Sequence, residues 1–149
     1  MDILKLLYPD DEIFISGYEF DDKELSIRVK CVVPNKSYAK RYVPYVTAEN
    51  YVRCLSQASY LLSYHVLSNK LIPADIDENS FLKAMENYEL YYRNLSMTFH
   101  KQSKRNEEFI MDLSLKNFRG IKTLKDYILF TFVNKKIVIG GEMSFVFLK

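Results

Sequence analysis

The residues best suited to chemistry lie at the start of a predicted helix. Glu49 stands in its first turn, with Thr47 as the N-cap and Ala48 as the first helical residue. A carboxylate there can act as base or nucleophile towards a carbonyl group, and the backbone N–H groups of the helix end can stabilise an oxyanion. The alternative is that Glu49 only interacts favourably with the helix dipole.

Three tyrosines, Tyr38, Tyr42 and Tyr45, precede this helix in a loop spanning 34–46 that also holds two prolines. A phenol beside the helix end could donate a hydrogen bond to a substrate carbonyl. Each ring could equally be buried for stability, with its hydroxyl left in water. Three such residues together favour at least one that faces a pocket.

Two polar residues, Ser56 and Gln57, lie further along the same helix. A helical serine often donates to the carbonyl one turn back and has no further role. A buried glutamine is costlier and needs hydrogen-bond partners. Both are therefore candidates to line a site, with a structural role as the alternative.

Familiar catalytic and metal-binding motifs are absent from the sequence: it has no GxSxG, HExxH, CxxC, P-loop or GxGxxG. Two histidines exclude a His-rich metal site. Cys54 and His65 are eleven residues apart, which places them roughly 16 Å apart along a helix and excludes a nucleophile–base pair. We expect no metal and no resident cofactor, and we expect Cys31 and Cys54 to be buried and reduced.

The composition indicates one ordinary globular domain over residues 1–149. The chain is 48% hydrophobic and 27% charged, with a net charge of +2. Acidic and basic residues alternate, which argues against a nucleic-acid partner. The densest basic run, KQSKR at 101–105, is expected to be a solvated hairpin turn between two strands rather than a phosphate site. No signal peptide or membrane-spanning run is recognisable, so we expect a cytoplasmic protein.

Periodicity predicts the elements that must position these residues. A short helix over 1–9 and strands over 12–20 and 24–33 are followed by a long helix over 48–69. A second helix is predicted over 78–90, with a buried side formed by Phe81, Leu82, Met85 and Tyr88. Four strands complete the chain, over 91–101, 107–118, 126–133 and 137–149. The third of these is apolar on both faces and is expected to be central, and Gly140–Gly141 suggests a bulge or bend in the last.

The long helix carries no formal charge for sixteen residues between Arg53 and Lys70. It is too polar to cross a membrane, so something must enclose it. An α+β arrangement satisfies this requirement: an antiparallel sheet of about six strands curls around the long helix, with a second, short helix. This is the hotdog fold, in which a second subunit usually covers part of the remainder, so we expect a homodimer or higher oligomer.

One stretch, SYAKRYVPYVTAENYVRCLSQASYLL, resembles the FcoT-like thioesterases, a hotdog family. The resemblance rests on Tyr38, Tyr45–Val46, Ser56–Gln57 and Ser59–Tyr60, and the order of elements extends it from about residue 7 to the end. Three positions depart from the family pattern. Thr47 and Ser56 replace asparagines, and Asp10 replaces a tyrosine after a proline, although Tyr8 lies just before Pro9.

The resemblance implies action on a fatty acyl chain carried by CoA or by the phosphopantetheine of an acyl carrier protein. Such enzymes lack a dedicated nucleophile and use tyrosine and asparagine side chains to bind the thioester and orient water. Some members add glycine to an enoyl chain instead. We therefore expect catalytic roles for Tyr38, Ser56, Gln57 and Glu49. We expect substrate contacts from Thr47, Tyr45, Tyr8 and Tyr60.

Two other functions stay open. The replaced asparagines suggest a non-catalytic hotdog module that binds an acyl chain or a partner subunit. A hotdog dehydratase ranks last, because it needs a histidine near the helix start and neither His65 nor His100 is expected there.

Overall fold

The computed structural model describes residues 2–36, 40–74, 76–121, 124–134 and 139–148. Its helices are α1 (Leu4–Leu7), α2 (Ala48–Ser68) and α3 (Glu78–Glu86), with a short 3-10 turn, η1 (Asp10–Glu12). Its strands are β1 (Ile15–Asp21), β2 (Ser26–Val32), β3 (Leu90–Phe99), β4 (Glu108–Ile121), β5 (Leu124–Asn134) and β6 (Ile139–Leu148).

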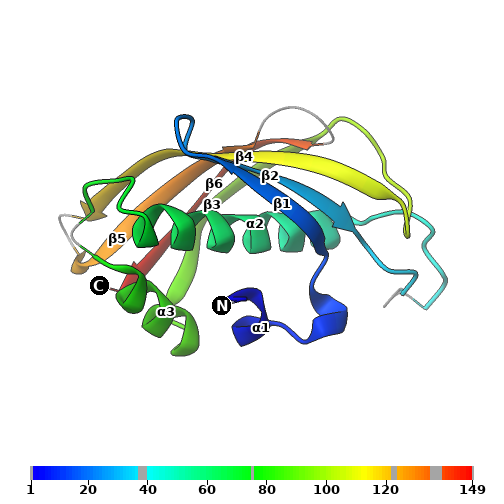
Figure 1. The fold of residues 1–149 in the computed structure, drawn as a ribbon. Coiled ribbons are helices and arrows are strands. Elements are labelled where there is room, and N and C mark those ends of the chain that lie inside the picture. The colour runs from blue at the N-terminus through cyan, green and yellow to red at the C-terminus, as the bar shows by residue number, and fades with distance from the viewer. Residues whose placement is uncertain (1, 37–39, 75, 122–123, 135–138, 149) are drawn as a thin grey trace.

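The six strands form one antiparallel sheet in the order β1-β2-β4-β5-β6-β3. The sheet arches over α2, while α1 and α3 lie on the opposite side of that helix (Figure 1). This is the hotdog arrangement that the sequence predicts. The apolar strand over 126–133 is central, as expected, because β5 lies between β4 and β6.

Helix α2 begins where the sequence predicts, because its first turn is closed by a capping box. The Thr47 side chain accepts from the Asn50 backbone N–H, and the Asn50 side chain accepts in turn from the Thr47 backbone N–H at 3.0 Å. Further along, the Ser59 and Ser63 hydroxyls donate to backbone carbonyls of their own helix at 2.8 and 2.7 Å. Uncharged residues can therefore fill the enclosed helix without leaving polar groups unpaired.

The core lies between α2 and the concave face of the sheet. Leu55, Leu62 and Val66 of the helix are buried against it, as their spacing predicts. On the sheet, Phe130 packs edge-to-face on Phe147 with ring centroids 5.2 Å apart. Cys31 and Cys54 are both buried and free, which confirms the expectation for the two cysteines.

The prediction of a solvated hairpin turn at 101–105 is wrong. β3 and β4, which this segment joins, are not neighbours: β3 pairs with β6 and β4 pairs with β2 and β5. The segment therefore crosses from one edge of the sheet to its interior. Two of its residues, Ser103 and Arg105, are buried rather than solvated.

Two other local predictions are also wrong. Helix α3 ends at Glu86, four residues early, and Tyr88 has a positive φ and is 82% exposed instead of buried. The Gly140–Gly141 pair makes no bulge and stays in register with Thr98 and Met97. A side chain on Gly141 would collide with the Ser96 carbonyl, so glycine allows close strand approach there.

Candidate functional site

Two hollows flank the N-terminal half of α2. One, the Tyr8 hollow, has a volume of about 420 Å³ and is lined by Tyr8, Ala48, Glu49, Val52, Arg53 and Ser56. The other, the Phe99 hollow, has a volume of about 350 Å³ and is lined by Val46, Ala48, Tyr51, Phe99, His100, Lys101 and Gln102. Ala48 belongs to both, so the helix start separates them.

A cluster of four hydroxyl groups, from Tyr8, Ser56, Tyr60 and Tyr92, lies beside the Tyr8 hollow. The Tyr92 and Ser56 hydroxyls share a hydrogen bond, and Ser56 Oγ also donates to the Val52 carbonyl at 2.9 Å. The Tyr60 hydroxyl lies near the Tyr8 and Tyr92 hydroxyls and interacts with both. This hydroxyl cluster brings together the end of α1, α2 and β3, which are distant in sequence.

The three phenols of the hydroxyl cluster are neutral at ordinary pH. Burial raises the pKa of Tyr8, Tyr60 and Tyr92, and for Tyr8 and Tyr92 the neighbouring Tyr60 raises the pKa further. Tyr92 as a residue is 45% exposed, because its ring lies on the edge strand, but its hydroxyl end faces α2. Neutral phenols can donate hydrogen bonds to a carbonyl oxygen but are poor bases.

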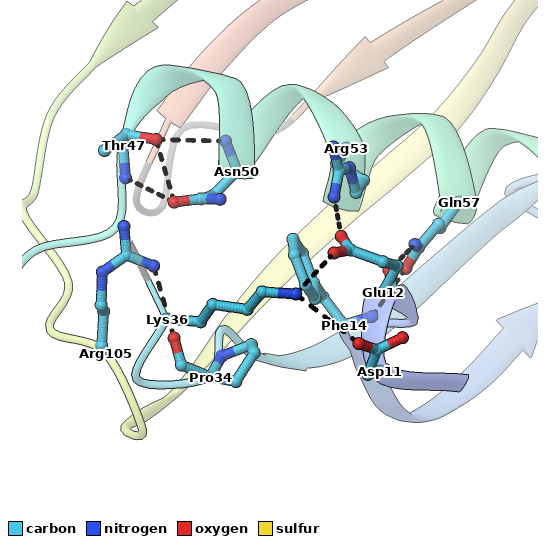
Figure 2. Close-up of polar contacts among 10 residues, drawn as sticks. All are labelled: Asp11, Glu12, Phe14, Pro34, Lys36, Thr47, Asn50, Arg53, Gln57 and Arg105. Atoms are coloured by element: carbon cyan, nitrogen blue, oxygen red, sulfur yellow. Dashed lines mark hydrogen bonds and ion pairs between the residues drawn. The ribbon is translucent and has the colours of Figure 1, made fainter. Parts of the chain in front are cut away.

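A network of charges borders the Tyr8 hollow (Figure 2). Arg53 is paired with Glu12, and its guanidinium stands 5.4 Å from the centre of the Phe14 ring. The Nζ atom of Lys36 lies 3.5 Å from Glu12 Oε1 and 3.6 Å from Asp11 Oδ2. The positive charge at the edge of the hollow is thus fixed in place and partly offset by carboxylates.

Gln57 is fully buried and its amide is engaged by backbone. Its Oε1 accepts from the Phe14 N–H at 2.9 Å, and its Nε2 donates to the Glu12 carbonyl at 2.8 Å (Figure 2). These bonds join α2 to the chain between η1 and β1. The partners that a buried glutamine needs are thus supplied by main chain.

The structure brings part of the predicted site together. Tyr8, Glu49 and Ser56 line one hollow, and the Tyr60 hydroxyl lies behind it, near that of Tyr8. Ser56 also makes the bond one turn back that its position predicts.

The other predicted site residues lie elsewhere. Thr47 is occupied by the capping box, and Gln57 faces η1 and β1. Tyr45 is exposed and forms an isolated β-bridge with Lys104. Tyr38 lies outside the described residues.

Three further residues line the hollows or belong to the hydroxyl cluster, although the sequence does not predict them as site residues. Arg53 was visible as the one basic residue in the first half of α2, four positions after Glu49. Tyr92 had no local signal, because its role depends on the tertiary contact between β3 and α2. His100 was expected far from the helix start, yet it lines the Phe99 hollow with Ala48.

A larger hollow, of about 740 Å³, lies at the other end of α2, around the β1–β2 turn. There His65 stacks on Phe20 with ring centroids 3.7 Å apart, and its Nε2 lies 2.7 Å from Asp22 Oδ1. His65 is therefore remote from the hydroxyl cluster. Within the described ranges, no group of three His, Cys, Asp or Glu side chains could hold a metal ion.

The fold has a counterpart among solved structures. A protein from Ralstonia eutropha JMP134, described as a proposed thioesterase related to phenylacetic acid degradation, is similar with a TM-score of 0.52 and 11% identity. The match covers 89% of this chain and 83% of that one. The likeness supports the hotdog fold. No protein-family model and no curated protein sequence matches the chain.

No helix in the described part of the chain is both long enough and apolar enough to pass through a lipid bilayer.

Proposed function

We propose that this protein is an acyl-thioester hydrolase whose site is the Tyr8 hollow. The observation that carries the proposal is the hydroxyl cluster beside the central helix of a hotdog fold. The description of the Ralstonia eutropha structure as a proposed thioesterase supports the same reaction class. The substrate would be a fatty acyl chain on CoA or on a carrier protein, as in the FcoT-like family.

In the proposed reaction, a neutral phenol donates a hydrogen bond to the thioester carbonyl oxygen. Tyr8, which lines the hollow, and Tyr38 are the proposed donors. Water adds to the carbonyl carbon, the C–S bond breaks, and the thiol leaves with a proton. Glu49, exposed at the rim, would accept one proton of the attacking water and pass it to the departing sulfur, which restores the carboxylate. One well-placed oxyanion donor contributes a factor of about 10²–10³.

We also propose that the active form is a homodimer. β3 is an edge strand, and its large apolar side chains are exposed: Tyr91, Tyr92, Leu95 and Phe99. An exposed apolar edge strand is a template for pairing with another chain. Because Tyr92 and Phe99 also belong to the hydroxyl cluster and the Phe99 hollow, a second subunit would close both hollows.

A specific observation favours the second candidate, a module that binds acyl chains without turnover. Thr47 and Gln57, two of the polar residues expected to act on substrate, are occupied by a helix cap and by backbone groups. Such a site would retain a lipid but lack groups to activate water.

The test is a panel of saturated and α,β-unsaturated acyl thioesters on CoA and carrier protein, with and without glycine. Wild type is compared with Tyr8→Phe, Tyr38→Phe and Tyr88→Phe, the last a matched control at an exposed tyrosine outside β3. If the yield of free acid falls in Tyr8→Phe and in Tyr38→Phe but not in the control variant, the hydrolase proposal is supported. A glycine adduct among the products would instead place the protein in the amine-adding branch of the family. If no thioester in the panel is turned over and a lipid co-purifies with the protein, the binding module is favoured.

A 3-hydroxyacyl thioester added to the panel tests the dehydratase, for which His100 near the helix start is the relevant residue. Formation of an enoyl product that His100→Asn abolishes would replace the hydrolase proposal.

A further inference from the structure

The chain just before α2 is held by the crossover segment 103–106. The Val46 N–H donates to the Ser103 carbonyl at 2.9 Å, and the Arg105 N–H donates to the Pro44 carbonyl at 3.1 Å. The Asn106 N–H donates to the Val33 carbonyl at 2.8 Å. The segment therefore binds both described ends of the 34–46 loop.

Arg105 adds side-chain bonds at the same two ends. Its Nε donates to the Val43 carbonyl at 2.7 Å and its Nη1 donates to the Pro34 carbonyl at 3.3 Å. Arg105 is only 8% exposed, and among the described residues it has no ion-pair partner, whereas Arg28 and Arg53 are each paired with a carboxylate. A buried charge satisfied by carbonyls alone is costly. The rigid fork of the guanidinium donates to both carbonyls at once, a fixed geometry that the flexible ammonium of a lysine does not match.

The loop ends that Arg105 holds lead to two residues on the α2 side of the Tyr8 hollow, Glu49 and Arg53. At one end, Val46 directly precedes Thr47, so its backbone position sets where the first turn of α2, with Glu49, begins. The Ser103 N–H also donates to the Tyr51 hydroxyl at 3.1 Å, which ties the segment to the helix itself.

At the other end, Lys36 lies two residues after Pro34, and its ammonium lies beside Glu12. Glu12 is in turn paired with Arg53, which lines the hollow. Figure 2 shows Arg105 on Pro34 beneath the Thr47–Asn50 cap, with Lys36 reaching towards η1.

We infer that Arg105 is a positioning residue, which fixes the loop before α2 and thereby the geometry of the Tyr8 hollow. Its effect on turnover rests on the proposed hydrolase function, but its effect on the loop does not. A misplacement of about 1 Å at reacting groups can cost about a hundredfold in rate.

The first arm of the test uses limited trypsin digestion of the folded protein, followed by mass spectrometry. Lys40 and Arg41 lie in the loop and Lys23 lies in the β1–β2 turn, and all three are exposed. Arg105→Gln should raise cleavage after Arg41 about tenfold while cleavage after Lys23 stays unchanged. Arg28→Gln, which breaks an ion pair with Asp112 far from the loop, is the matched control for general destabilisation. Equal cleavage after Arg41 in wild type and Arg105→Gln would overturn the inference.

The second arm measures turnover of the best thioester from the panel. Arg105→Gln and Arg105→Lys should lower kcat about tenfold to a hundredfold with little change in KM, and Arg28→Gln should not. Free guanidinium ion, kept below denaturing concentrations, should restore part of the turnover of Arg105→Ala and leave the turnover of Arg28→Ala unchanged. If Arg105→Gln keeps wild-type kcat, Arg105 does not position the site. If wild type itself is inactive, the hydrolase proposal fails, and the trypsin arm alone decides whether Arg105 holds the loop.

Discussion

The hydroxyl groups of Tyr92 and Ser56 share a hydrogen bond that joins the edge strand β3 to the central helix α2. The two residues are 36 positions apart. The Tyr60 hydroxyl lies near this bond and near Tyr8 in the chain segment after α1, so a group of hydroxyls lies at both walls of the proposed site.

Tyr92→Phe tests this connection. We expect the free energy of unfolding to fall by about 1 kcal/mol, the usual net value of one hydrogen bond, because the ring is retained and the hydroxyl is lost. Urea denaturation measures this change. Thioester turnover should fall by more than the loss of folded protein explains, because the phenol of Tyr8 loses its ordered neighbours. Tyr88→Phe, which alters an exposed phenol outside β3, should change neither quantity.

The raised pKa values of Tyr8, Tyr60 and Tyr92 predict a loss of stability at alkaline pH. An unfolded chain releases these protons near pH 10, whereas the folded protein retains them. The folded state therefore binds more protons, and the free energy of unfolding decreases as pH rises through and above about 10. Below that pH the contribution is fully present.

Urea titrations across the alkaline range measure this slope. The triple Tyr→Phe variant of these positions should show a shallower decline, and Tyr88→Phe, which alters an exposed phenol, should follow wild type. Identical slopes for the triple variant and wild type would contradict the expected burial of the three hydroxyls.

Gln57→Met should destabilise the protein by about 2–4 kcal/mol, because the Phe14 N–H and the Glu12 carbonyl would both lose their buried partner. Methionine preserves the length of the side chain, so the cavity term is small. Gln102→Leu, at an exposed position, is the control. A loss below about 1 kcal/mol, together with a strong fall in kcat, would return Gln57 to the catalytic role that the sequence suggests.

The two thiols should be inert in the folded protein. Cys31 and Cys54 are buried, and burial raises the pKa of the Cys54 thiol, so little thiolate is present. A coloured disulfide reagent at mildly alkaline pH should react with neither thiol until urea is added, and then with both. Lys23→Cys, in the exposed β1–β2 turn, provides the reactive control. Rapid reaction of native wild type would show that the core opens easily.

The fold could be predicted because its strongest signal is local. A long uncharged helix with Leu55, Leu62 and Val66 at helical spacing needs an enclosing surface, and the alternating strands supply one. Strand pairing could not be predicted in the same way. The segment 101–105 has the composition of a turn, and only the sheet order shows that it is a crossover with a buried arginine.

The site was predictable to the extent that it lies on α2. Glu49 and Ser56 follow from helix position and Tyr8 follows from the family resemblance; all three line the Tyr8 hollow, and their roles stay predictions. Tyr92 was missed because nothing in the sequence around it encodes a contact 36 residues away. Gln57 was singled out for the right physical reason, a buried amide that needs partners, but those partners are backbone groups.

The place of β3 in the sheet has a consequence for how the protein is made. In the described sheet its only neighbour is β6 (Ile139–Leu148), which is synthesised almost fifty residues after β3 begins. While the nascent chain leaves the ribosome, β3 and Tyr92 must therefore wait unpaired until β6 emerges. A truncation within β6 would act on the same step, so the proposed site should form only after β6 has been synthesised.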